Sequence, residues 1–189
     1  MKIYSHFLRE TLLKIYLYLI PLLISIYVRA QTITPAGSTW AVSVPAITEA
    51  GDNYTGTYQS ASNVIILSGN LPGSFLNLLS SGAARVSTHY NATTWNSNLH
   101  LYAKRAGGST TINGICVLCT ATINGGTTYT EIPLATAASF FTINFTGVLG
   151  LGNSVNFSAI SVQLQIAGVS VTVPAASYSA QIVFTIGAN

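Results

Sequence analysis

Few side chains after residue 30 could do acid–base chemistry, and they are scattered along the chain. The carboxylates are Glu49, Asp52 and Glu131, and the histidines are His89 and His100. A glycosidase needs two carboxyl groups roughly 5–10 Å apart on either side of one bond. Glu49 and Asp52 flank an expected turn and are remote in sequence from Glu131, so we expect all three carboxylates to be solvated.

Neither histidine has the context of a catalytic base. No Gly-x-Ser-x-Gly motif occurs, and the α/β pattern that this motif requires is missing. His100 alternates with Leu99 and Leu101, which predicts an outward-facing strand residue. The glycine-rich stretch 147–152 contains no lysine and precedes no helical pattern, so it does not resemble a phosphate-binding loop. We therefore expect no enzymatic activity and no cofactor.

The two cysteines stand three residues apart, as Cys116-Val-Leu-Cys119. A redox pair of this spacing belongs at a helix start within a βαβ pattern, whereas the neighbours here are strand and turn residues. In an exported chain we expect a local disulfide. It would require a bulge or tight turn, because residues i and i+3 of a regular strand point to opposite faces. Unpaired thiols are the alternative, and two cysteines without a histidine at ligand spacing predict no metal site.

One large aromatic side chain lies in a polar loop. Trp95 is surrounded by asparagine, threonine and serine in residues 91–98, with Tyr90 and Asn96 close to it in sequence. Sugar binding uses such an arrangement, because aromatic rings stack on sugars while amide side chains hydrogen-bond to them. Trp95, Tyr90 and Asn96 are therefore the candidate glycan contacts. The alternative is that Trp95 folds back onto the core.

The elements that must position these residues are strands. Residues 160–166, 169–173 and 180–186 alternate between apolar and polar side chains, with turn residues at Gly168 and at 174–177. Period two is typical of a strand with one buried face, because successive side chains leave opposite sides of the backbone. Turn signals recur roughly every 8–12 residues, as in sandwiches and barrels.

These patterns predict that residues 31–189 form one all-β domain. We expect an immunoglobulin-like or jelly-roll-type β-sandwich of about nine or ten short antiparallel strands. The first strand is predicted at 40–44, where Trp40 alternates with smaller residues, and a hairpin turn is predicted at 124–126. Only 74–81 has the spacing of a helical turn.

The first 30 residues predict a signal peptide. Basic residues at 2, 9 and 14 precede an apolar run of about 14 residues at 15–28, which is shorter than the roughly 20 residues that span a bilayer. Small or β-branched residues at 28 and 30 place the expected cut between Ala30 and Gln31. The chain would then be exported through the inner membrane to the periplasm, the cell surface or the medium. An uncleaved N-terminal anchor is the alternative.

The charge of the remaining chain excludes one class of partner. Three basic residues (85, 104 and 105) and three acidic residues (49, 52 and 131) give residues 31–189 a net charge of zero. A nucleic-acid-binding protein needs a basic surface to neutralise phosphates, so we expect no nucleic-acid partner. Low net charge weakens self-repulsion and favours association with other copies or with a surface.

The C-terminal stretch resembles a known group of exported proteins. Val173-Pro-Ala-Ala-Ser-Tyr-Ser-Ala-Gln-Ile-Val-Phe-Thr-Ile186 is similar to the closing strand of bacterial spore coat U-like and fimbrial-subunit domains. The resemblance covers under a tenth of the chain. It implies an immunoglobulin-like sandwich that serves as a building block of a surface or fibre.

These observations predict an exported, non-enzymatic surface protein with a structural or adhesive role. It would self-associate or bind surface partners through sheet edges and through faces rich in threonine and asparagine. One alternative is a carbohydrate-binding module that uses Trp95, Tyr90 and Asn96. A second alternative is a small outer-membrane β-barrel, which alternation and low charge favour but the short strands do not.

Overall fold

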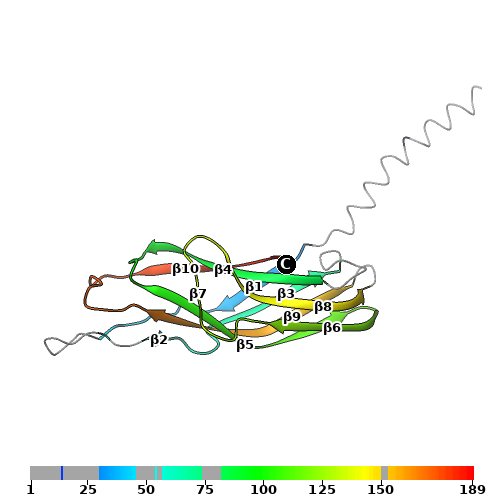
Figure 1. Ribbon diagram of the computed structural model, residues 1–189, viewed down its shortest axis with the longest axis horizontal. Helices are drawn as coiled ribbons and strands as arrows, with labels where there is room; N and C mark the ends of the chain where they lie inside the picture. The colour runs from blue at the N-terminus through cyan, green and yellow to red at the C-terminus, as the bar shows by residue number, and fades with distance from the viewer. Residues whose placement is uncertain (1–13, 15–29, 46–53, 55–56, 74–81, 150–152) are drawn as a thin grey trace, which may run out of the picture. The chain divides into compact units, whose positions relative to one another are not determined.

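The computed structural model describes residues 14, 30–45, 54, 57–73, 82–149 and 153–189 (Figure 1). Contacts divide the chain into two units, 1–30 and 31–189, and the strands all belong to the second unit. Glu49, Asp52 and the predicted helical turn at 74–81 lie outside the described residues. Within the described residues, no helix has the length and apolar character needed to cross a membrane.

Ten strands in the described residues form two open antiparallel sheets (Figure 1). Sheet A has the order β1-β3-β9-β5-β7, and β2 pairs with β9; sheet B has the order β10-β4-β8-β6. The predicted all-β sandwich of antiparallel strands is therefore confirmed. The strands are β1 (Thr32–Gly37), β2 (Tyr58–Gln59), β3 (Ile65–Pro72), β4 (Gly82–Thr94), β5 (His100–Asn113), β6 (Cys116–Asn124), β7 (Thr130–Glu131), β8 (Ala138–Leu149), β9 (Ser154–Ala167) and β10 (Ser179–Ala188).

Alternate side chains of the two sheets meet in one hydrophobic core. Fully burying a large apolar side chain contributes roughly 1.5–3 kcal/mol, so this core supplies most of the stability. The alternation that predicts β9 and β10 is present in the structure, and in β9 it places Ile160, Val162 and Leu164 on the buried face. The largest fully buried side chains are Phe141, Phe145, Phe157, Leu67, Leu71, Ile132, Ile143, Ile160, Val86, Val155 and Val162.

A bulge in β9 keeps its buried face continuous. Leu67 of β3 pairs with Ile160, and Gly69 pairs with Phe157, so residue 68 lies opposite both 158 and 159. Ala159 takes a φ of 55° at this point. The extra residue restores Phe157 to the same side as Ile160, where both side chains are buried.

Two predicted strands are wrong. Residues 40–44 belong to no strand; the first strand is β1, in the polar stretch before them, and it pairs with β3. β1 is an edge strand with mostly exposed side chains, so it has no hydrophobic alternation to reveal it. Residues 169–173 form a turn, because Ser170 accepts bonds from the backbone N–H groups of Thr172 at 3.3 Å and Val173 at 3.0 Å.

One charged side chain lies in the core. Arg105 is 8% exposed, and its guanidinium carbon is 5.6 Å from the centroid of the Phe141 ring. Nη2 donates to the carbonyl of Ile123 in β6 at 3.0 Å, and Nη1 donates to the carbonyl of Gly107 in β5 at 3.3 Å. Burial lowers the pKa of the guanidinium. Arg105 therefore joins the two sheets.

Candidate functional site

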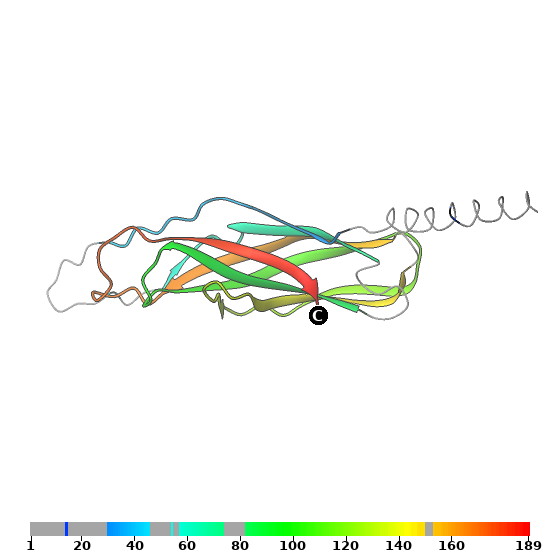
Figure 2. The same ribbon diagram turned by 90° about the horizontal axis from the view of Figure 1, so that it is seen from above.

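A cleft lies along the side of the sandwich where β1 and β10 are edge strands of opposite sheets. Figure 2 shows β1 and the segment after it, in blue, running alongside β10, in red. The cleft has a volume of about 1080 Å³ and is lined mainly by residues 35–44 and 173–182. Leu101, Leu164 and Ile166 also line it, so the cleft reaches the core between the sheets.

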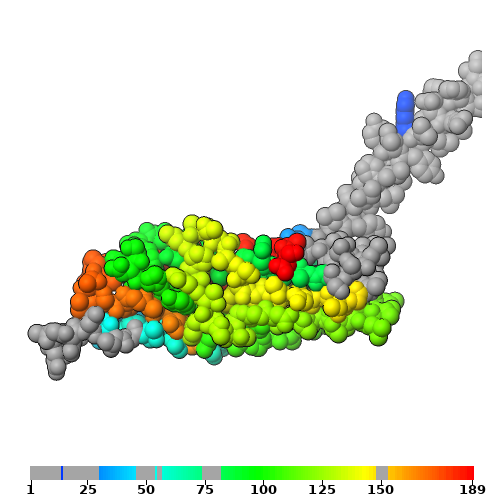
Figure 3. All heavy atoms as spheres, viewed as in Figure 1, coloured from blue at the N-terminus to red at the C-terminus, as the bar shows by residue number. Residues whose placement is uncertain are grey.

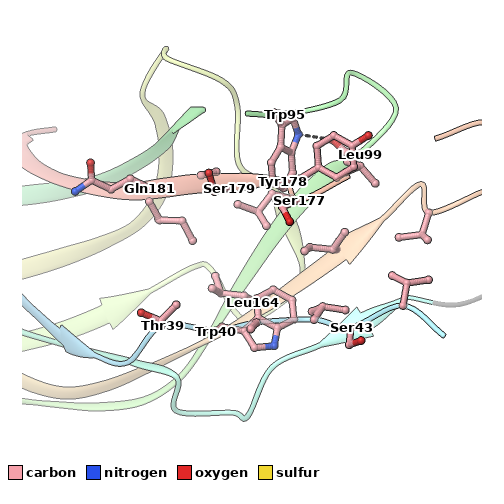
Figure 4. A pocket seen from close by; sticks show the side chains of 18 of the residues that line it. Thr39, Trp40, Ser43, Trp95, Leu99, Leu164, Ser177, Tyr178, Ser179 and Gln181 are labelled. Atoms are coloured by element: carbon pink, nitrogen blue, oxygen red, sulfur yellow. Dashed lines mark hydrogen bonds between the residues drawn. The ribbon is translucent and has the colours of Figure 1, made fainter. Parts of the chain in front are cut away.

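Aromatic rings form two facing walls of this cleft (Figure 4). Trp95, which follows β4, and Tyr178, which precedes β10, lie on one wall. Trp40, which follows β1, lies on the opposite wall beside Leu164 of β9. The three rings thus come from segments far apart in the sequence, and the pairing of strands in both sheets brings them together.

The rings on the first wall are held by their own polar groups. Nε1 of Trp95 donates to the carbonyl of Leu99 at 2.9 Å, and the Tyr178 hydroxyl donates to the carbonyl of Pro174 at 2.7 Å. The Tyr90 ring supports Trp95, with 5.4 Å between the two ring centroids. Because these groups are already bonded, Trp95 and Tyr178 offer a ligand mainly their ring surfaces.

The remaining polar groups of the cleft are uncharged. None of the described residues that line it is acidic or basic. Ser179 and Gln181, from the edge strand β10, have side chains without a hydrogen-bond partner among the described residues. The cleft can therefore stack on apolar surfaces and exchange hydrogen bonds, but its described lining contains no carboxylate, histidine, lysine or cysteine that could act as a general base or activate its hydroxyl groups.

The three predicted glycan contacts, Trp95, Tyr90 and Asn96, lie in different environments in the structure. Trp95 packs against the core, as the alternative prediction has it, and it also lines the cleft. Tyr90 is only 7% exposed, and burial raises the pKa of its phenol. The negative charge of the Glu131 carboxylate raises this pKa further. Asn96 shapes the loop, because its side-chain oxygen accepts from the N–H of Asn98 at 2.9 Å.

Sequence reasoning does not assign Trp40 or Tyr178 to a binding site. The alternation around Trp40 predicts a core strand residue; the ring does pack against the core, but it belongs to no strand and also lines the wall of the cleft. Tyr178 follows the turn at 174–177, which marks the approach to β10 but gives no sign of a partner across the sandwich. The sequence contains a local signal for Trp95 alone, namely its polar loop.

His100 and Glu131, two of the titratable side chains singled out in the sequence, lie outside the cleft. His100 Nδ1 is 2.7 Å from Oε1 of Glu131, and both side chains are about half exposed. Such a surface ion pair adds little stability. Within the described part of the chain, histidine, cysteine, aspartate and glutamate form no group of three or more that could hold a metal ion.

The cysteines and the predicted cleavage position lie elsewhere in the chain. Cys116 and Cys119 form a disulfide within β6, with 5.8 Å between their Cα atoms. The register of β6 on β8 shifts between Val117 and Thr120, as a bulge between the cysteines requires. The predicted cut between Ala30 and Gln31 coincides with the boundary between the two compact units. Cleavage itself stays a prediction.

Comparisons with protein-family models, with curated proteins and with solved structures give no match for this chain.

Proposed function

We propose that this chain is an exported, non-enzymatic surface protein with an adhesive role, and that it binds a neutral glycan in the cleft between β1 and β10. The observation that carries the proposal is the pair of tryptophans on facing walls of an uncharged cleft, Trp40 and Trp95. The predicted signal peptide at 1–30 supports export. The uncharged lining supports binding in place of catalysis.

A neutral glycan fits the chemistry of this cleft. A sugar ring has apolar C–H faces that stack on aromatic rings, and hydroxyl groups that hydrogen-bond to side chains such as Ser179 and Gln181. An acidic polysaccharide or a phosphate would bring charges that no described side chain of the lining neutralises. The volume of about 1080 Å³ lies just above the roughly 300–1,000 Å³ of ligand pockets, which favours several linked sugar units.

A glycan array that holds neutral and acidic glycans tests this proposal. We expect wild type to bind a neutral subset, and we expect Trp40→Leu and Trp95→Leu to lose at least about tenfold in affinity, which corresponds to about 1.4 kcal/mol. Tyr102→Leu is the matched control, because this partly exposed ring of β5 lies outside the cleft. Circular dichroism should confirm that each variant is folded. Binding of acidic glycans alone, or equal loss in the control, contradicts the proposal.

Assembly into a fibre or coat is the second candidate function. β10 pairs with β4 on one side only and is otherwise an edge of sheet B beside the cleft. An unpaired edge can accept a strand from another chain. The resemblance of 173–186 to closing strands of fibre subunits supports this candidate as well. Sedimentation velocity should then detect oligomers that grow with concentration, whereas a monomer at high concentration contradicts assembly.

A further inference from the structure

The β5–β6 connection and the first residues of β6 expose three large apolar side chains. Ile115 is 86% exposed, Val117 is 67% exposed and Leu118 is 93% exposed, and together they form what we call the apolar tip. Exposed apolar residues that stand singly need no explanation, and the other large ones among the described residues are scattered. Three such residues within four positions indicate contact with an apolar partner.

The backbone of the apolar tip is fixed before any partner binds. The disulfide between Cys116 and Cys119 closes a four-residue loop, and Leu118 within it takes a φ of 51°. Opposite the loop, a Cβ on Gly147 would lie 2.6 Å from Sγ of Cys119, so β8 packs closely against the disulfide. A preformed surface loses little conformational entropy when it binds.

The described strand segments that adjoin the apolar tip carry no charge. The described residues of the adjoining strand segments 109–124 and 142–158 contain no aspartate, glutamate, lysine or arginine. The polar neighbours are threonine, serine and asparagine; for example, the Asn153 side chain donates to the carbonyl of Ile115. Moving this end into an apolar medium would therefore cost no desolvation of a charged group from these segments.

A second protein does not fit this end well. β6 is an edge strand, but the bulge between Val117 and Thr120 interrupts the ladder that a further strand would need. A stable protein interface uses roughly 20–30 residues on each side, far more than three adjacent side chains supply. A lipid bilayer needs no such complementarity and accepts a small uncharged apolar surface.

The chain enters the sandwich at the end that carries the apolar tip. Thr32 pairs with Asn70, Asn70 pairs with Asn156, and Asn156 pairs with Thr111, so the start of β1 is level with the end of β5. The β5–β6 connection follows directly and lies at one end of residues 31–189, in light green in Figure 3. Thr32, close after the predicted cut between Ala30 and Gln31, thus lies at the same end of the sandwich as the apolar tip.

We propose that the apolar tip inserts into the boundary between headgroups and acyl chains of a neutral phospholipid bilayer. Ile115, Val117 and Leu118 would be the inserted side chains, and the disulfide would hold them in position. Binding through the tip alone should be weak and reversible, since even a myristoyl chain gives only marginal attachment. A membrane contact at this end leaves the cleft, which opens between β1 and β10, accessible to a glycan.

Tryptophan reporters at single sites test the proposal. The protein is used in the form that is purified from the cells that express it, whether or not residues 1–30 have been removed. Leu118→Trp is the reporter at the tip, and Leu134→Trp is the matched control at another exposed leucine. Each is mixed with vesicles of phosphatidylcholine that carry brominated acyl chains, and the wild-type signal from Trp40 and Trp95 is subtracted. An assay of total vesicle binding would not be specific, because residues 1–30, where they are retained, would bind vesicles themselves. A reporter at one site responds only when that site enters the bilayer.

We expect the emission of Leu118→Trp to shift to the blue and to fall at least twofold with brominated lipid, while Leu134→Trp does not change. Ile115→Trp is a second reporter, which guards against a folding defect specific to position 118. An Ile115→Ser/Leu118→Ser double variant of residues 31–189 that is folded by circular dichroism should partition at least tenfold less than the same chain without the substitutions. Unchanged emission at both tip positions overturns the proposal, as does binding that requires anionic lipid. Neither outcome affects glycan binding in the cleft.

Discussion

Gly69 of β3 lies directly beneath the ring of Phe157 in β9, and this contact predicts the effect of one added methyl group. The two residues are cross-strand neighbours, and Phe157 is 1% exposed. A Cβ on Gly69 would lie 2.7 Å from Cε1 of Phe157 and closer still to the carbonyl oxygen of Thr32 in β1. The ring would have to leave its position in the core, and the Thr32 backbone cannot move without disturbing the β1–β3 pairing.

We therefore expect Gly69→Ala to destabilise the protein. Overpacking a core costs about 1–3 kcal/mol, and the reduced entropy of the unfolded chain offsets about 0.4–1 kcal/mol of this cost. A net loss of about 1 kcal/mol should lower Tm by about 2–4 °C in a domain of this size. Urea unfolding followed by circular dichroism measures the free energy of unfolding directly.

Gly187 of β10 supplies the matched control for this experiment. A Cβ at Gly187 meets nothing within 4 Å, so Gly187→Ala should leave the free energy of unfolding unchanged or raise it by about 0.5 kcal/mol. If Gly69→Ala is as stable as Gly187→Ala, then Phe157 does not cover Gly69, and the register of β3 on β9 is wrong. A Gly69→Ala/Phe157→Leu double variant should recover part of the loss, because the smaller side chain makes room.

Three further predictions concern the core and the disulfide. The Tyr129 hydroxyl is buried without a hydrogen-bond partner, so Tyr129→Phe should raise the free energy of urea unfolding by about 1 kcal/mol; a loss of stability would contradict this assignment. Burial raises the pKa of both Tyr90 and Tyr129 above the ordinary value of 10.0. As the pH rises, the two phenols therefore ionise at a lower pH in the unfolded chain than in the folded protein. Stability should be full below pH 10 and fall as the pH rises through the folded-state pKa values, and the fall should be smaller in Tyr129→Phe. Closing the loop between Cys116 and Cys119 restricts only four residues, so Cys116→Ala/Cys119→Ala should cost about 2 kcal/mol. Reductant should destabilise the wild type by that amount and leave this variant unchanged.

The strands that bury one face were predictable from the sequence. In β9, Ile160, Val162 and Leu164 alternate with polar residues, and the structure buries all three. A strand with one buried face shows this period, because its buried positions take apolar side chains and its exposed positions take polar side chains. β1 was not predictable in this way, since a mostly exposed edge strand places no such demand on its side chains.

The candidate site was only partly predictable. Trp95 has a local signal, because a large aromatic ring in a polar loop is unusual for a residue that only packs. Trp40 and Tyr178 become neighbours of one cleft because two edge strands from opposite sheets meet there. The spacing of residues in the sequence does not show that β1 and β10 lie close together in the fold. Similarly, the exposure of Leu118 depends on the bulge and disulfide of β6.

A fluorescence titration with a neutral glycan identified on the array tests the central claim most directly. Trp40 and Trp95 are the only tryptophans of the chain, and both line the cleft. We predict a saturable change in tryptophan emission in wild type, a smaller change in Trp95→Leu and Trp40→Leu with weakened affinity, and a wild-type response in Tyr102→Leu. Binding that leaves the emission of both tryptophans unchanged, or that survives both substitutions at full affinity, would contradict a glycan site in this cleft.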